Sequence, residues 1–110
     1  MEVDVNGEAG GLPEEVAHHV FRIGQEAVTN AVNHANANQI TLKLKIDPRL
    51  LSLQVADDGC GFEPEDVFTS RNGNFGLIGM RERAERLGGE LRLESETGKG
   101  TRLEVTVPLK

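Results

Sequence analysis

The sequence is poor in several residue types, and each shortage excludes a structure. It has no Trp, no Tyr and only four Phe among 110 residues, so its core has to be built from Leu, Val, Ile and Ala. The single cysteine, Cys60, excludes an intrachain disulfide and a zinc site made of several thiolates. No apolar run approaches the roughly 20 residues that a membrane-spanning helix needs, and no signal-peptide pattern opens the chain. We therefore expect a soluble domain.

Cationic residues are also few. The chain has 12 Lys and Arg against 18 Asp and Glu, which gives a net charge of −6. An acidic domain lacks the basic surface of a nucleic-acid binder, so no nucleic-acid partner is expected. An anionic ligand would have to be held by local features, such as helix N-termini, backbone N–H groups or a metal ion. The length is that of one domain, residues 1–110.

Hydrophobic periodicity predicts a strand, a long helix and two more strands in the first half of the chain. Residues 1–6 alternate apolar and polar side chains and favour an edge strand. After a Gly-Gly-Leu-Pro break, apolar residues recur at intervals of three and four from about Pro13 to Ala35, which predicts one helix. Two alternating segments, 38–47 and 51–57, predict two strands joined by a turn.

The second half combines a long loop with one helix and two strands. Residues 58–75 are rich in Gly, Asp, Asn and Pro and predict a loop with one helical turn near 64–68. An amphipathic helix is predicted over 77–87, ended by a Gly-Gly pair, and strands follow at 91–93 and 103–107. The expected fold is α/β of the α+β kind. It is a two-layer sandwich whose mixed, mostly antiparallel sheet of about five strands carries about three helices on one face.

Glu26 and Asn30 lie four residues apart in the predicted long helix and therefore share a face, at the border of its apolar stripe. A carboxylate and an amide oxygen so placed could hold a hard cation. Magnesium suits such a pair, because it binds few protein oxygens and completes its octahedron with phosphate oxygens and waters. The same pattern is also that of a solvated polar edge of an amphipathic helix.

Asp57 ends a predicted strand and is followed by the alternating glycines Gly59 and Gly61. The carboxylate could accept a hydrogen bond from an exocyclic amine such as that of adenine. The glycines would let backbone approach a flat ring without a Cβ in the way. An ordinary Asp-Gly turn explains the same residues.

Two further motifs could serve an anionic nucleotide. The glycine-rich stretch 72–83 leads straight into a helix and would expose N–H groups to phosphate, with Arg81 and Arg83 adding charge. A solvated first helical turn is the alternative. In the last turn, Lys99 favours a solvated hairpin over a phosphate contact, whereas the Thr101 hydroxyl could reach the same base as Asp57.

Taken in order, these motifs resemble the ATP-binding domain of bacterial sensor histidine kinases. The similarity is greatest to the subfamily that pairs with response regulators of the nitrate/nitrite type, and it covers the chain from about Leu12 to Leu109. The matching segments are the family's N box at 21–30, its first glycine box at Asp57, Gly59 and Gly61, its second at 76–83, and its last at Gly98, Gly100 and Thr101.

The resemblance implies the Bergerat ATP-binding sandwich of gyrase-type ATPases, heat-shock protein 90 and mismatch-repair ATPases. It implies that Asn30 ligates Mg²⁺, that Asp57 binds the adenine amine and that Thr101 supports the base. Glu26 stands where gyrase-type relatives carry their catalytic base, and here it would polarise the incoming histidine or order a water on Mg²⁺. Residues 62–75 would form a lid. The other implied nucleotide contacts are His34, Gly59, Gly61, Gly76, Leu77, Gly79, Met80 and Arg81.

Two features depart from the family pattern. Asn33 stands where many members carry Lys, which weakens a phosphate contact at that position. None of His18, His19 and His34 is followed by the acidic residue that marks the family's phospho-accepting histidine. That acceptor is therefore expected on a preceding helical dimerisation domain. His18 and His19 fall within the long helix and are expected to be surface or partly packed residues.

The implied function is half of an autokinase. The domain would bind Mg·ATP and donate the γ-phosphoryl group to the histidine of the dimerisation domain, from which it passes to an aspartate of a response regulator. It would be cytoplasmic without touching the membrane, even where the inner membrane anchors the parent protein, and it would dimerise only through the other domain. Two alternatives keep the fold: an anti-sigma-factor serine kinase, which the sequence 79–83 argues against, and a non-catalytic nucleotide-binding module, which the intact boxes argue against.

Overall fold

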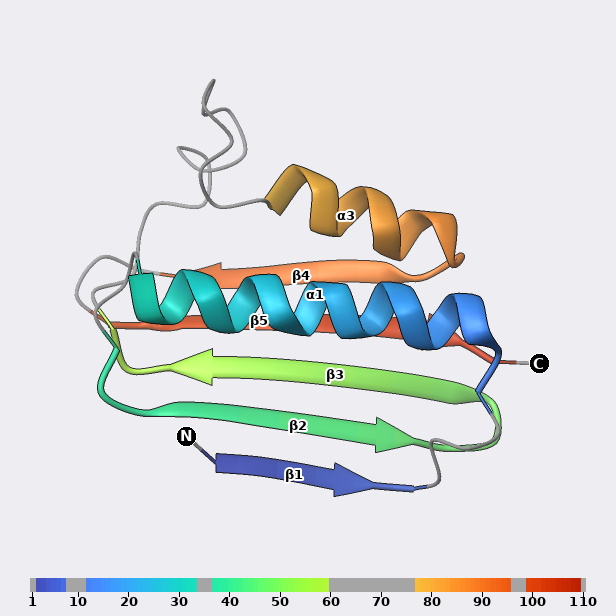
Figure 1. Cartoon of the computed structure of the whole chain (residues 1–110), viewed down its shortest axis with the longest axis horizontal. Helices are drawn as coiled ribbons and strands as arrows, with labels where there is room; N and C mark the ends of the chain where they lie inside the picture. The colour runs from blue at the N-terminus through green and yellow to red at the C-terminus, as the bar shows by residue number, and fades with distance from the viewer. Residues whose placement is uncertain (1, 8–11, 34–36, 60–76, 96–98, 110) are drawn as a thin grey trace.

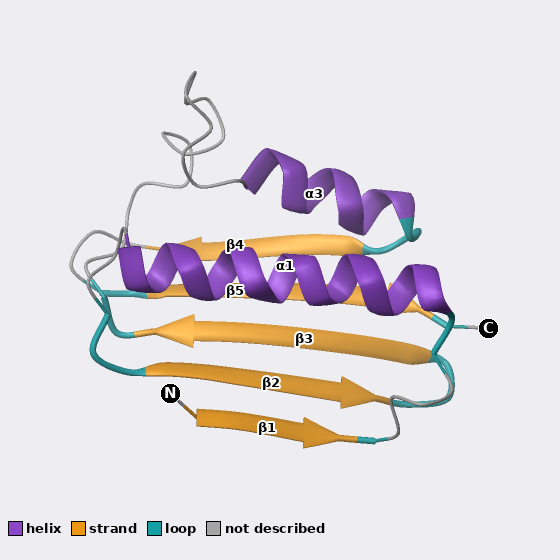
Figure 2. Cartoon of the chain, in the orientation of Figure 1, coloured by secondary structure: helices purple, strands orange, loops and turns teal. Residues whose placement is uncertain are grey.

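The computed structural model describes residues 2–7, 12–33, 37–59, 77–95 and 99–109. Within these ranges the chain forms five strands and two helices (Figure 2). None of the helices in this part of the chain is long and apolar enough to cross a membrane. The elements are β1 (Glu2–Asn6), α1 (Glu14–Asn33), β2 (Ile40–Ile46), β3 (Leu50–Asp57), α3 (Leu77–Arg86), β4 (Glu90–Ser95) and β5 (Thr101–Pro108).

The five strands form one sheet in the order β1-β2-β3-β5-β4. The edge strand β1 pairs with β2 in parallel, and the three other pairs are antiparallel. Both helices lie on the same face of this sheet, α1 over its middle and α3 beside β4 (Figure 1). The predicted α+β sandwich with its N-terminal edge strand is confirmed. The expected helical turn at 64–68 lies outside the described residues.

Helix α1 packs on the sheet through a stripe with helical spacing. Val20, Ile23, Ala27 and Ala31 are all buried, and they follow one another at three or four residues, so they share a face. Gly24 lies in the same region, where an added Cβ would be 3.5 Å from a methyl carbon of Leu53 on β3. Small residues on this face thus let the helix axis come close to the strands.

The matching face of the sheet is apolar because its strands alternate. Leu51, Leu53 and Val55 of β3 are buried, as are Leu103, Val105 and Val107 of β5, while the residues between them are more exposed. Met80 and Ala84 of α3 complete this core. Any further residue of β3 or β5 that continues this alternation therefore has its side chain on the helix-covered face of the sheet.

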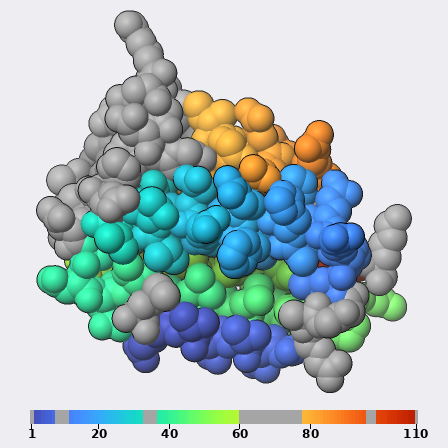
Figure 3. Space-filling view, in the orientation of Figure 1, coloured from blue at the N-terminus to red at the C-terminus, as the bar shows by residue number. Residues whose placement is uncertain are grey.

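The β1–β2 side of the same face is only partly covered. A hollow of about 780 Å³ runs between α1 and the strands β2 and β3, and Phe21, Val28, Leu42 and Leu44 are among its lining residues. Figure 3 shows this side of the molecule, with β2 and β3 visible in green between α1 and β1. Phe21 is 68% exposed at the rim of this apolar groove.

The predicted Gly-Gly stop of the second helix is confirmed in detail. Gly88 has a positive φ of 75°. Its N–H donates to the carbonyl of Glu85 (2.9 Å), and the N–H of Gly89 donates to that of Ala84 (2.8 Å), which is the Schellman pattern of a helix C-terminus. An added Cβ at Gly89 would lie 2.2 Å from the carbonyl oxygen of Thr106. The turn therefore brings β4 directly alongside β5.

We expect Ile23→Ala to lower the free energy of unfolding by about 2–5 kcal/mol, because it leaves a cavity between α1 and the sheet. The side chain of Ile23 is fully buried. The matched control is Val32→Ala in the same helix, where the side chain is 56% exposed and a change below about 0.5 kcal/mol is expected. Urea titration followed by far-UV circular dichroism measures both variants, and equal losses would contradict this packing.

Candidate functional site

Three of the predicted motifs, those that carry Asn30, Asp57 and Thr101, lie toward one end of the sandwich. The C-terminal end of α1, the last residues of β3 and β4 and the first residue of β5 all lie on the left in Figure 1. In register, Thr101 is the partner of Asp57 on one side and of Ser95 on the other. These three residues continue the alternation of Val55 and Leu103. The apolar face of the sheet therefore ends in a polar row.

Asp57 is half-buried in this row. Its Oδ1 accepts a hydrogen bond from the backbone N–H of Gly59 (2.8 Å), and the backbone of Thr101 also bonds to the carboxyl group. Burial raises the pKa of Asp57 and the charge of Asp58 adds to this effect, while the two backbone hydrogen bonds oppose it. Backbone hydrogen bonds thus hold the Asp57 carboxylate in place, but it is only partly solvated. A hydrogen-bond donor on a ligand would therefore stabilise its ionised form.

The neighbouring Asp58 has a structural role. Its Oδ1 accepts hydrogen bonds from the backbone N–H groups of Asn38 and Gln39, both at 2.9 Å, and these bonds lower the pKa of Asp58. The Asp58 N–H in turn donates to the carbonyl of Gln39 (3.2 Å). The alternative of an ordinary Asp-Gly turn thus applies to Asp58, whose hydrogen bonds connect the start of β2 to the end of β3. Asp57 remains the candidate for a ligand.

Thr101 is oriented by a neighbour that the sequence analysis did not identify. The hydroxyl of Ser95 lies 2.9 Å from that of Thr101 and donates to the carbonyl of Gly100 at 3.2 Å. Gly100 has a positive φ of 87°, and an added Cβ would lie 2.3 Å from the carbonyl oxygen of Asp57. Only glycine suits this close approach. A polar residue opposite Thr101 in the C-terminal hairpin was the available signal for Ser95.

Glu26 and Asn30 are both half-buried on α1, between its buried stripe and its exposed face, as predicted. In the described part of the chain, no group of three or more His, Cys, Asp or Glu side chains is placed to hold a metal ion. Among the described residues, Glu26 is the carboxylate one turn from Asn30, and a bound ligand could supply further oxygens to a cation there. Magnesium accepts this arrangement, since one or two protein oxygens and substrate phosphates are its usual ligands.

Helix α3 distributes its predicted contacts over two faces. Gly79 is exposed, and no atom of the described residues lies within 4 Å of the position of an added Cβ. Arg81 is also exposed. In contrast, Met80 is 1% exposed and belongs to the core. Arg83 lies against His19 of α1, its Nη1 2.9 Å from the ring Nδ1, and so points to the helix interface.

Most of the remaining predicted site residues lie outside the part of the chain that the structure describes. His34, Gly61, Gly76 and the lid at 62–75 lie outside the described residues. Leu77 is the first residue of α3. The apolar groove and a second hollow of about 780 Å³ at the other end of the sandwich are not lined by Asn30, Asp57 or Thr101. The candidate site is therefore the polar end of the sheet itself.

Two curated proteins that this chain resembles are both named as histidine kinases. DegS of Bacillus subtilis, a signal transduction histidine-protein kinase/phosphatase, is 39% identical over 90 residues, which are 82% of this chain and 23% of DegS. The sensor histidine kinase LiaS of the same bacterium is 39% identical over 109 residues, 99% of this chain and 29% of LiaS. The chain thus spans less than a third of the length of these relatives.

A solved structure is similar over nearly the whole chain. The histidine kinase domain of the blue-light activated histidine kinase from Erythrobacter litoralis EL346 gives a TM-score of 0.74 at 30% identity, covering 98% of this chain and 51% of that one. The family model of histidine kinase-, DNA gyrase B- and HSP90-like ATPases matches residues 15–110, which include Asn30, Asp57 and Thr101. The chain therefore belongs to the histidine kinase-, DNA gyrase B- and HSP90-like ATPase family.

Proposed function

We propose that this chain is the ATP-binding catalytic domain of a sensor histidine kinase. It binds Mg·ATP and donates the γ-phosphoryl group to a histidine on a separate dimerisation domain, from which the group passes to a response regulator. The observation that carries this proposal is the half-buried Asp57 carboxylate beside Thr101, at the polar end of an otherwise apolar sheet face.

The polar row suits the adenine base. The exocyclic amine of adenine is a hydrogen-bond donor, and the Asp57 carboxylate can only accept while it is ionised. While the single proton of the Ser95 hydroxyl is donated to the Gly100 carbonyl, the Thr101 hydroxyl donates to Ser95 and presents its lone pairs to the ring. Thr101 can donate to the ring only when Ser95 donates to Thr101 instead. Buried Val55 and Leu103 precede this row on the same face and offer apolar surface to a flat base.

The phosphates would lie toward α1 and the start of α3. Asn30 would ligate Mg²⁺, which supplies neutralising charge to the phosphate oxygens when bound. Glu26, one turn earlier, can orient a water or the incoming acceptor. No described residue fills the space beside Gly79 in the first turn of α3. Backbone N–H groups without an intrahelical partner attract anions at such a turn, and exposed Arg81 adds a positive charge.

The phosphoryl acceptor belongs on another domain. His19 is buried and engaged with Arg83, which leaves it inaccessible to a nucleotide. The relatives DegS and LiaS are named as histidine kinases, and both are more than three times as long as the segment that this chain matches. Since ATP is the substrate, we propose that the domain works in the cytoplasm.

Mixing this chain with labelled ATP and a separately purified dimerisation domain of the same kinase tests the proposal. Acid-labile label on the histidine of that domain is expected, and none on this chain alone. Acid-stable label on a serine would instead indicate the serine kinase alternative. Nucleotide binding without any transfer would indicate a non-catalytic module.

Asp57→Ala should weaken Mg·ATP binding by about 1–3 kcal/mol, roughly 5- to 150-fold, because the adenine amine loses its acceptor. Burial raises the pKa of Asp57, so its ionised form is less favourable in the folded domain than in the unfolded chain, and the substitution should not lower the stability of the nucleotide-free domain. Calorimetric titration and urea unfolding measure the two effects.

The neighbouring Asp58→Ala is the matched control and should behave in the opposite way. It removes the acceptor of two backbone N–H groups and therefore lowers the free energy of unfolding, with a smaller effect on nucleotide affinity in the folded protein. If both variants lost affinity and stability in the same proportion, the separate assignment of the two carboxylates would be wrong.

Asn30→Ala should remove the dependence of ATP affinity on Mg²⁺. We expect about a tenfold loss with Mg²⁺ present, as for removal of one ligand to a charged group, and no further loss when EDTA is added. Thr29→Ala, in the adjacent exposed position of α1, is the control and should keep the EDTA effect. An undiminished EDTA effect in Asn30→Ala would exclude Asn30 as a magnesium ligand.

A further inference from the structure

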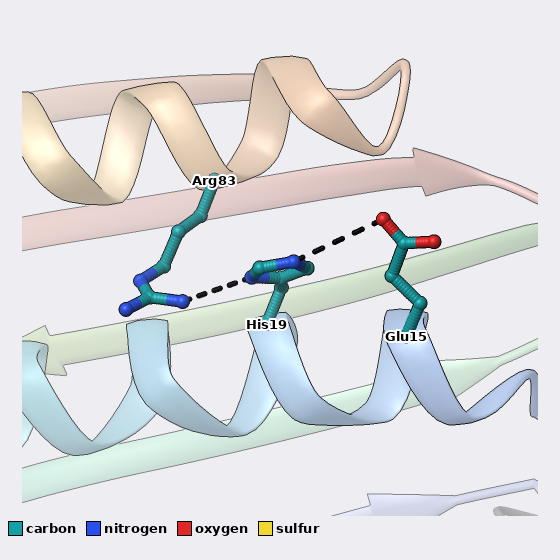
Figure 4. A network of polar contacts seen from close by, with 3 residues as sticks. All are labelled: Glu15, His19 and Arg83. Carbon is teal, nitrogen blue, oxygen red and sulfur yellow. Dashed lines mark hydrogen bonds and ion pairs between the residues drawn. The ribbon is translucent and has the colours of Figure 1, made fainter.

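His19 is the polar side chain that the fold buries among the described residues, with 8% of its surface exposed. It lies on α1 and faces α3 (Figure 4). Its Nδ1 is 2.9 Å from Nη1 of Arg83 on α3, and its Nε2 is 4.0 Å from Oε1 of Glu15 on α1. Buried polar side chains are retained where they make a specific contact, and here the contact joins the two helices.

The chemistry of the two groups fixes the protonation state of the ring. A guanidinium has only donors, so Nδ1 of His19 must accept from Arg83 with its lone pair. The ring is then neutral and carries its proton on Nε2, on the side of Glu15. A doubly protonated imidazole would present an N–H at both nitrogens. The contact with Arg83 therefore exists only while His19 is neutral.

The surroundings of His19 oppose its protonation. Burial lowers its pKa most, and electrostatic repulsion by Arg83 on α3, by the neighbouring His18 on α1 and by Arg86 on α3 lowers it further, while Glu15 on α1 acts in the other direction. The ring of His18 is 5.2 Å from that of His19, centre to centre. Glu15 is a weak counter-charge because most of its side chain is exposed and solvent screens it.

Arg83 connects this contact to the candidate nucleotide site. It lies four residues after Gly79 in α3, one helical turn and about 6 Å along the axis. The Gly79–Arg81 turn is the part of α3 that the proposed function places next to phosphate. A helix moves largely as a rigid body over one turn, so the contact of Arg83 with α1 contributes to the position of that turn, together with the buried Met80 and Ala84.

We propose that His19 is a positioning residue for nucleotide binding, whose neutral ring holds Arg83, and with it α3, against α1, and whose protonation releases them. The inference rests on the proposed function in so far as α3 contacts the nucleotide. When His19 gains a proton, two cations face each other at the helix interface and the hydrogen bond is lost. ATP affinity then falls as the solution becomes more acidic.

The direction of the pH effect follows from the lowered pKa of His19. The folded protein prefers the neutral ring more than the unfolded chain does, whose histidine has a pKa of 6.5. The stabilisation is complete above that pH and is lost as the pH falls through the lower pKa of the folded state. The relevant window therefore lies below pH 6.5.

The test compares Mg·ATP titrations of the 110-residue chain between pH 8 and pH 5.5 for the wild type, His19→Gln and His18→Gln. The amide oxygen of Gln can accept from Arg83 at every pH, whereas His18 is an exposed histidine of the same helix. Protonation of the nucleotide affects all three proteins equally. We expect the wild type to lose about fivefold more affinity than His19→Gln over this range. His18→Gln should lose at least as much as the wild type, with an onset at higher pH, because the repulsion of His19 by His18 is removed. Parallel losses in all three would overturn the proposal.

Two measurements without nucleotide test the contact between His19 and Arg83 even if ATP does not bind or if His19→Gln fails to fold. Ring nitrogen chemical shifts should show Nδ1 of His19 as an unprotonated acceptor at pH 7.5, and Arg83→Gln should raise the pKa of His19. Hydrogen exchange of the α3 amides, corrected for intrinsic rates, should show increased opening of the wild type below pH 6. A protonated Nδ1 at pH 7.5, or α3 opening that does not depend on His19, would overturn the proposal. Absence of ATP binding at every pH would instead count against the proposed function.

Discussion

The antiparallel pairing of β3 with β5 is the constraint on which the rest of the molecule depends. Its register buries three residues of each strand on one face and sets Asp57 opposite Thr101. A slip of one residue would turn every side chain of a strand to the other face, so the core and the site cannot be changed separately. The tight approach of Gly100 to the carbonyl of Asp57 holds this register at the end where the site lies.

Much of this arrangement could be predicted because it depends on short-range patterns. Alternation located the strands and the three-four spacing located both helices, while the order of four motifs pointed to the site. Three details needed the tertiary structure. Asp58 differs from Asp57 in accepting hydrogen bonds from the backbone at the start of β2. Met80 is buried because of the orientation in which α3 packs on the sheet. His19 is buried by a helix whose contacting residue is 64 positions away.

The candidate site shows how a small domain combines stability with binding. Its apolar face ends in Asp57, Thr101 and Ser95, whose hydrogen bonds to backbone and to each other are already made without a ligand. Such a site needs little rearrangement to receive a base. Its cost to the fold is the incomplete solvation of Asp57, which the raised pKa of that carboxyl records.

The apolar groove beside α1 has a practical consequence for work on this protein. A folded chain with an open hydrophobic hollow of about 780 Å³ offers environment-sensitive dyes a binding place before any unfolding occurs. Dye-based melting curves will therefore begin from high fluorescence and understate the transition. Intrinsic fluorescence offers no substitute in a chain without Trp or Tyr, so backbone circular dichroism, amide exchange and calorimetry are the methods suited to this domain.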